Sequence, residues 1–186
     1  MRAILLRHGI TEANRSHRYC GVTDLPLDEE ALAAFRANRP VYPDPAGFRV
    51  LTSGMKRTEQ TLREIYGDVP HEAVPAFREI DFGVFENRCY EELKDDPAFQ
   101  QWVSGDNEAN VCPGGESGNQ MKARVYAAWD VLEEDVLLVT HGGVLAALMA
   151  HLFPEQTKNR YEWQPEPFTG YMVWTENGRW QYRTIP

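Results

Sequence analysis

Ile4-Leu5-Leu6-Arg7-His8-Gly9 and Val136-Leu137-Leu138-Val139-Thr140-His141-Gly142-Gly143 are the two stretches that decide the fold. Each begins with a short apolar run, which predicts a buried strand, and continues into a histidine followed by glycine. Open α/β sheets bind ligands at the carboxyl ends of their strands, where glycine lets the backbone approach a ligand closely. We therefore expect His8 and His141 at a ligand-binding edge, with Arg7 supplying positive charge for an anion.

Strands and helices alternate along the rest of the chain, which predicts a layered α/β domain. Further strands are expected at 48–51, 73–77 and, as a terminal hairpin around Asn177-Gly178, at 171–175 and 180–185. Helices are expected at 28–35, 55–66, 89–103 (in two pieces broken at Pro97), 117–133 and 143–153. Residues 10–27 are expected to form a loop over the sheet edge.

Length and composition favour a single domain spanning residues 1–186. A hydrophobic content of 42% and a charged content of 25% are typical of a globular protein. The net charge of −9 argues against nucleic acid or an anionic membrane as the partner. No apolar run reaches the ~20 residues of a membrane helix and no signal pattern opens the chain, so we expect a cytoplasmic protein. Three cysteines without Cys-x-x-Cys spacing predict reduced thiols.

A third strand end strengthens the expectation of an anion site. The strand at 48–51 runs into Thr52-Ser53-Gly54, and the helix that follows contains Arg57. If these strands are parallel neighbours, their ends converge on one pocket that holds two histidines and two arginines. Helix N-termini after Gly54 and Gly142 would add N–H groups and positive dipole. Such a pocket suits a phosphoryl group, whose oxygens match guanidinium forks.

The motifs around these residues resemble those of the histidine phosphatase superfamily, which includes the cofactor-dependent phosphoglycerate mutases. They follow in the family's order along most of the chain: Leu6–Asn14, Arg18–Leu27, Ser53–Thr61, Phe77–Gly83, Gly114–Ser117 and Val139–Gly143. The resemblance implies an α/β fold, a phosphoglycerate mutase-like three-layer α/β/α sandwich with a mostly parallel central sheet and a C-terminal hairpin. Within the superfamily, the motifs are most similar to the α-ribazole phosphatase branch.

The resemblance also implies roles for individual residues. His8 would attack phosphorus and become phosphohistidine, while Glu79 would protonate the leaving oxygen and then deprotonate a water molecule. The other implied site residues are the clamps Arg7, Arg57 and His141 and the substrate-binding contacts Asn14, Gly142, Thr11, Gly21 and Ser53. A nucleophilic His8 must donate from its other ring nitrogen, and we expect a backbone carbonyl as the acceptor. No metal and no cofactor are implied, because the arginines supply the charge.

Several assignments stay open at this stage. Asp81 and Glu86 are carboxylates close to Glu79 that could serve as the acid instead. Three arginines could line the entrance or be solvated, and three histidines are expected at the surface or in packing: Arg15, Arg18 and Arg88, and His17, His71 and His151. The tract at 164–167 is expected to be a turn-rich connection without a ligand role.

The function implied is that of a histidine acid-type phosphatase, a phosphoric monoester hydrolase acting on a small phosphorylated metabolite. The interval between Glu79 and Gly115 is too short for the insertion that shields phosphohistidine from water in the mutases, which favours hydrolysis. Two alternatives remain: a phosphoglycerate mutase-type phosphotransferase, and a non-catalytic phospholigand- or partner-binding domain on the same scaffold. The leaving-group loops, 10–27 and 83–113, do not name the substrate, although α-ribazole phosphate is a candidate. Nothing in the sequence indicates the oligomeric state.

Overall fold

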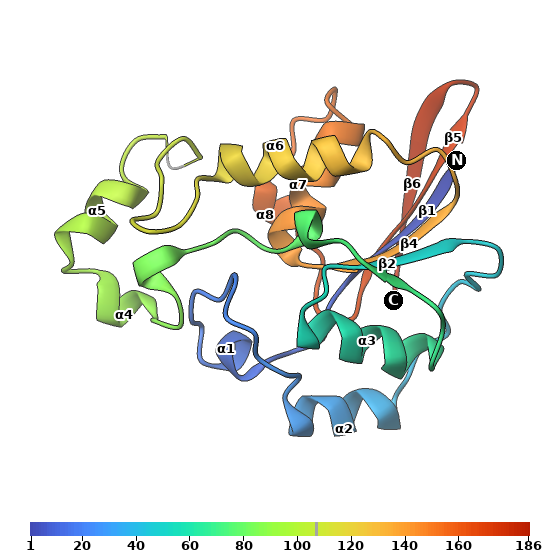
Figure 1. Ribbon diagram of the computed structural model, residues 1–186, viewed down its shortest axis with the longest axis horizontal. Coiled ribbons are helices and arrows are strands. Elements are labelled where there is room, and N and C mark those ends of the chain that lie inside the picture. The colour runs from blue at the N-terminus through green and yellow to red at the C-terminus, as the bar shows by residue number, and fades with distance from the viewer. Residues whose placement is uncertain (107) are drawn as a thin grey trace.

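A six-stranded sheet forms the centre of the computed structural model, which describes residues 1–106 and 108–186 (Figure 1). The strand order is β3-β2-β4-β1-β5-β6. The strands are β1 (Arg2–Arg7), β2 (Arg49–Thr52), β3 (Glu72–Ala73), β4 (Val136–Thr140), β5 (Gly170–Glu176) and β6 (Arg179–Ile185). Strands β1 to β4 pair in parallel, whereas β5 and β6 form an antiparallel hairpin beside β1. The predicted sheet, mostly parallel with a C-terminal hairpin, is confirmed.

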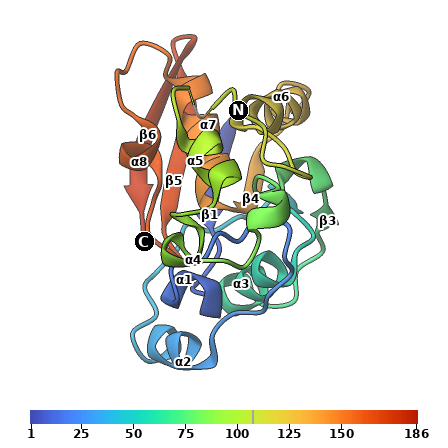
Figure 2. The same ribbon diagram turned by 90° about the vertical axis from the view of Figure 1, so that its left-hand side faces the viewer.

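Helices cover both faces of this sheet, so the molecule has the three layers that the sequence predicts. They are α1 (Glu12–Arg15), α2 (Glu29–Ala37), α3 (Lys56–Tyr66), α4 (Tyr90–Leu93), α5 (Pro97–Val103), α6 (Gly118–Trp129), α7 (Gly142–Leu152) and α8 (Arg160–Trp163). Helices α6 and α7 lie on one face and α2 and α3 on the other (Figure 1). Helices α4 and α5 extend from one end of the molecule and stand in front in the turned view (Figure 2).

Alternating side chains of the central strands build the two halves of the core. Leu5 of β1 packs towards α6 and α7, whereas Ile4 and Leu6 pack towards α2 and α3. All three side chains are fully buried. A parallel strand covered on both faces needs a continuous apolar run, which is why β1 and β4 are recognisable from sequence. Nine of the eleven residues of α7 are also buried.

Three segments differ from the predictions. Residues 73–77 were predicted as a strand, but only Glu72–Ala73 pair with β2, and Pro75–Phe77 form a 3₁₀ helix. Pro75 has no N–H for a sheet ladder and its fixed φ suits the first turn of a helix. The predicted loop at 10–27 contains α1, which a reciprocal cap between Thr11 and Asn14 stabilises. The short helix α8 was not predicted at all.

The helix predicted at 117–133 ends four residues early, at Trp129, and the other helix boundaries lie within two residues of the predicted ones. Asp28 caps α2 with its side chain, and Pro97 opens α5 after the break that separates it from α4. All three cysteines are free thiols. Within the described ranges, no helix is long and apolar enough to cross a bilayer. Asn107, part of the predicted leaving-group loop at 83–113, lies outside the described residues.

Candidate active site

The carboxyl ends of β1 and β4 bring the two strand-end histidines together. The two strands are parallel neighbours, with Arg7 opposite Thr140, so His8 and His141 leave the sheet side by side. Their ring centroids are 5.1 Å apart and the ring planes are inclined by 64°. Both side chains are almost completely buried. The convergence expected from the two sequence stretches is therefore present in the structure.

His8 is held in the tautomer that a nucleophile needs. Its Nδ1 donates to the carbonyl of Gly9 at 2.6 Å, the backbone acceptor that the sequence could not identify. The Gly9 N–H donates to Thr61 Oγ1 at 2.9 Å and so fixes this peptide. Burial, followed by the charges of Arg57 and Arg7, lowers the pKa of His8 well below its ordinary value of 6.5. The ring is neutral, and its Nε2 carries a lone pair.

Arg57 and His141 form a buried pair behind the nucleophile. Arg57 Nε donates to His141 Nδ1 at 3.2 Å, and His141 Nε2 then donates to Ser53 Oγ at 2.8 Å. Burial, with the Arg57 charge second, lowers the pKa of His141 well below 6.5. The Arg57 Nη groups donate to the carbonyls of Thr23 and Gly21 at 2.9 and 2.6 Å. Three of the five Arg57 N–H groups are used in this way, and contact of Arg57 and His141 with substrate oxygens stays a prediction.

Glu86 organises the loop that receives Arg57. Its carboxylate accepts from the backbone N–H groups of Gly21, Val22 and Thr23 at 3.0–3.1 Å. It also accepts from the N–H of Phe82 at 3.1 Å. A carboxylate occupied by this many donors is a structural anchor for the turn, because its charge is already satisfied. Glu86 is therefore a weaker candidate for the catalytic acid than Glu79.

Glu79 lies at the N-terminus of α7. Its Oε2 accepts from the Gly143 N–H at 2.8 Å and its Oε1 from the N–H of Ile80 at 3.0 Å. The positive end of the helix dipole favours a carboxylate at this position. A Cβ atom on Gly143 would overlap Glu79 Oε1, so any larger residue at this position would displace the Glu79 carboxyl group. Asp81, the other alternative acid, instead accepts from the Gly83 N–H at 2.8 Å.

A cavity of about 180 Å³ joins these groups. Of the predicted site residues, its wall contains Arg7, His8, Asn14, Glu79 and Gly142. Neither Asp81 nor Glu86 lines it, and neither do Arg57 and His141, which support the wall from behind. Among the described residues, the buried Nε of Arg7 has no hydrogen-bond partner, while Nη1 donates to the Pro165 carbonyl at 2.7 Å. An unpaired guanidinium donor in this setting suits an anionic ligand.

Three predicted contacts have structural partners instead of a place on the cavity wall. Thr11 caps α1 and binds Asn14, whose Oδ1 accepts from the Thr11 N–H at 2.9 Å. Gly21 offers its carbonyl to Arg57, and Ser53 accepts from His141. Contact of these three residues with substrate stays a prediction.

Arg18, one of the arginines that could line the entrance, does lie in the cavity wall. The structure adds wall residues that the sequence did not single out: Tyr19, Cys20, Phe82, Gly143, Arg160 and Gln164. Gln164 belongs to the tract that was expected to have no ligand role, and its amide lies 2.6 Å from where a Gly142 Cβ would stand. A second cavity of about 470 Å³ shares Arg7, Asn14 and Arg18 with the first. The smaller cavity therefore adjoins a larger one.

Comparison with known proteins identifies the family. Residues 3–185 match the model of the histidine phosphatase superfamily, branch 1. The chain belongs to the histidine phosphatase superfamily. It is 31% identical over 161 residues to an adenosylcobalamin/α-ribazole phosphatase of Salmonella typhimurium strain LT2, a match that covers 82% of this chain and 79% of the relative. The predicted family is thereby confirmed.

Solved structures support the same assignment. A phosphoglycerate mutase from Thermus thermophilus is 29% identical and superimposes with a TM-score of 0.72, covering 100% of this chain and 97% of its own. The α-ribazole phosphatase from Shigella flexneri, at 23% identity, shares the fold with a TM-score of 0.85 over 100% of this chain and 96% of that one. The chain is therefore an enzyme with the phosphoglycerate mutase-like fold, and its relatives include both phosphatases and mutases.

Proposed function

We propose that this enzyme hydrolyses small phosphomonoesters through a phosphohistidine on Nε2 of His8. The observation that carries the proposal is the Nδ1–H of His8 donating to Gly9, which leaves Nε2 unprotonated in the same cavity as Glu79. Nucleophilic catalysis by a group weak in its resting state requires this kind of orientation by a hydrogen bond. Arg7, with an unpaired Nε, supplies positive charge beside the reacting phosphorus.

The proposed reaction proceeds in two steps, formation of a phosphohistidine and its hydrolysis. The Nε2 lone pair attacks phosphorus, the bond from phosphorus to the ester oxygen breaks, and that oxygen takes a proton from Glu79. Water then attacks phosphorus and gives its proton to the Glu79 carboxylate, while the phosphorus–Nε2 bond breaks and phosphate leaves. The first step therefore uses Glu79 in its protonated form, and the second step returns that form.

The segment between Glu79 and α6 favours hydrolysis of the phosphohistidine over transfer of its phosphoryl group to a second substrate. This segment forms α4 and α5, which pack on a hydrophobic cluster of their own around Phe85, Phe99 and Trp102. Its described part contributes Phe82 to the wall of the catalytic cavity. With the larger cavity alongside, water has access to the phosphohistidine. As the substrate to test first, similarity to the Salmonella phosphatase favours α-ribazole phosphate.

Hydrolysis of p-nitrophenyl phosphate by the wild type and by His8→Ala tests the proposal. We expect turnover by the wild type, its loss in the variant, and a phosphorylated protein detectable by intact mass at alkaline pH. Equal rates would exclude His8 as the nucleophile. A second assay with 3-phosphoglycerate measures phosphate and 2-phosphoglycerate together, and 2-phosphoglycerate as the main product would assign the enzyme to the mutases. Binding of phosphate esters without any turnover would favour the non-catalytic alternative.

A further inference from the structure

Phe168 lies against the backbone of His8 and Gly9 in an unfavourable backbone conformation. Its φ of +64° is in the left-handed region, which bulky side chains rarely adopt. Its N–H donates to the His8 carbonyl at 3.4 Å. A Cβ atom on Gly9 would overlap the Phe168 ring, so the ring rests on the Gly9 backbone. Phe168 thus contacts both His8 and the residue whose carbonyl orients the His8 imidazole.

Two aromatic side chains hold Phe168 in this place. Phe35 of α2 stacks on its ring, with centroids 3.9 Å apart and planes inclined by 7°. The Tyr42 hydroxyl donates to its carbonyl at 2.7 Å. Burial raises the pKa of Tyr42 to about 12, so this hydroxyl remains a donor at neutral pH. A strained backbone persists only where its surroundings fix it, and these two contacts are part of those surroundings.

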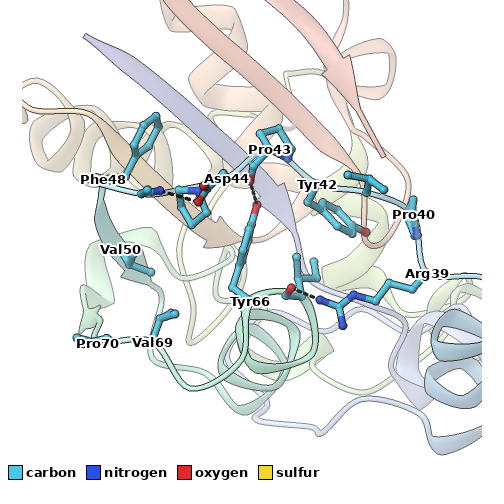
Figure 3. Close-up of a pocket in the computed structure, with 14 residues that line it drawn as sticks. Arg39, Pro40, Tyr42, Pro43, Asp44, Phe48, Val50, Tyr66, Val69 and Pro70 are labelled. Atoms are coloured by element: carbon cyan, nitrogen blue, oxygen red, sulfur yellow. Dashed lines mark hydrogen bonds between the residues drawn. The ribbon is translucent and has the colours of Figure 1, made fainter.

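Tyr42 also stands in the wall of a cavity of about 810 Å³ (Figure 3), and none of its named lining residues belongs to the wall of the catalytic cavity. The cavity lies between the chain at 39–46 and the end of α3. Tyr66 lines the same cavity, and its hydroxyl donates to the Pro43 carbonyl at 3.2 Å (Figure 3). Both tyrosine hydroxyls therefore donate to a backbone carbonyl, and of the two only Tyr42 binds Phe168.

We propose that Tyr42 and Phe168 are positioning residues for His8. The Tyr42 hydroxyl fixes the Phe168 carbonyl, and this keeps the Phe168 ring against the Gly9 backbone. The Gly9 carbonyl then remains aligned with His8 Nδ1, so the proton stays on Nδ1 and the lone pair on Nε2. The inference rests on the proposed role of His8 as nucleophile, and it extends the catalytic apparatus to residues outside the catalytic cavity.

Tyr42→Phe tests the inference, because it removes the hydroxyl and keeps the ring. We expect kcat to fall about tenfold, equivalent to one lost hydrogen bond, with KM unchanged. Phosphohistidine formation in a single turnover should slow by the same factor. The matched control, Tyr66→Phe, should behave like the wild type in both measurements. Equal losses in the two variants, or none in either, would overturn the proposal.

Nitrogen-15 NMR of labelled histidine provides a readout that needs no turnover. In the wild type we expect His8 as the Nδ1–H tautomer, and in Tyr42→Phe a measurable share of the Nε2–H tautomer. Phe168→Leu, which alters the ring contact without touching the hydroxyl, should show the same change. Unchanged His8 signals in both variants would refute positioning, whatever the kinetics. Loss of the proposed function would instead appear in the His8→Ala comparison and would leave this NMR result intact.

Discussion

Replacing Glu86 with glutamine tests whether this carboxylate holds the loop behind the active site. Oε1 accepts from the N–H groups of Gly21, Val22 and Phe82, and Oε2 accepts from the N–H and hydroxyl of Thr23. Glutamine keeps the shape but offers one acceptor oxygen and one NH₂ group, which is a donor. In the better of its two orientations, the amide oxygen serves the Oε1 donors and the NH₂ faces the Thr23 N–H.

The magnitude follows from these contacts. A hydrogen bond to a charged group contributes about 1.5–3 kcal/mol, and leaving a buried donor unpaired costs about 1–3 kcal/mol. Glu86 is half-buried, and the Thr23 hydroxyl can turn to accept from the new NH₂, so only one N–H is lost outright. We expect the free energy of unfolding to fall by about 2 kcal/mol. Because Thr23 and Gly21 carry the carbonyls that hold Arg57, we also expect kcat/KM to fall about tenfold, or about 1.4 kcal/mol.

Urea unfolding and p-nitrophenyl phosphate kinetics at one pH measure both effects. Glu91→Gln is the control, because Glu91 is exposed and, within residues 1–106 and 108–186, forms an ion pair with Lys94 alone, at 2.6 Å. Surface pairs of this kind contribute little, so the control should remain within about 0.5 kcal/mol of the wild type. A Glu86→Gln protein as stable as the wild type would refute the anchoring role. A destabilised protein with unchanged kcat/KM would show that the loop does not act through Arg57.

Two further predictions concern the buried histidines and the glycines of α7. Because the pKa values of His8 and His141 are held well below 6.5, these two side chains bind protons only in the unfolded chain as the pH falls below that value. Stability should therefore fall by about 1.4 kcal/mol per histidine for each pH unit until the folded-state pKa is reached, and an equal or higher urea midpoint at about pH 5.5 than at about pH 7.5 would contradict this. Gly143→Ala places a methyl group on Glu79 and should lower kcat at least tenfold, whereas Gly142→Ala meets only a flexible amide and should lose less. Equal kcat values for the two alanine variants would argue against the close approach of Glu79 to α7.

The sheet and the convergence of its strand ends could be predicted from the sequence because each strand is a short, continuous apolar run. The apolar runs of β1 and β4 are continuous since both faces of these strands are covered, and each run delivers a histidine to the same edge. The tautomer of His8 was also foreseeable, because a nucleophilic imidazole needs an acceptor on its other nitrogen. The acceptor itself, the carbonyl of Gly9, follows only from the backbone path after β1.

The residues that the sequence missed owe their place to tertiary packing. Arg160 and Gln164 belong to a four-residue helix and the turn after it, which are too short for any periodicity to appear. They reach the cavity because α8 packs on α7. The left-handed backbone conformation of Phe168 could not be predicted either. Such a conformation is expected at glycine or asparagine, and this position holds an aromatic residue.

The three neighbouring carboxylates show why spacing alone left the acid open. Glu79, Asp81 and Glu86 are carboxylates that lie close together in the sequence. What distinguishes them is which N–H groups donate hydrogen bonds to each. The donors to Glu86 come mainly from the loop around Gly21, so its charge is used to fix that loop. The donors to Glu79 are its neighbour's N–H and the first turn of α7, and its carboxyl group remains on the cavity wall. A carboxyl group can exchange a proton with substrate only if it reaches the substrate's cavity, and of the three only Glu79 does.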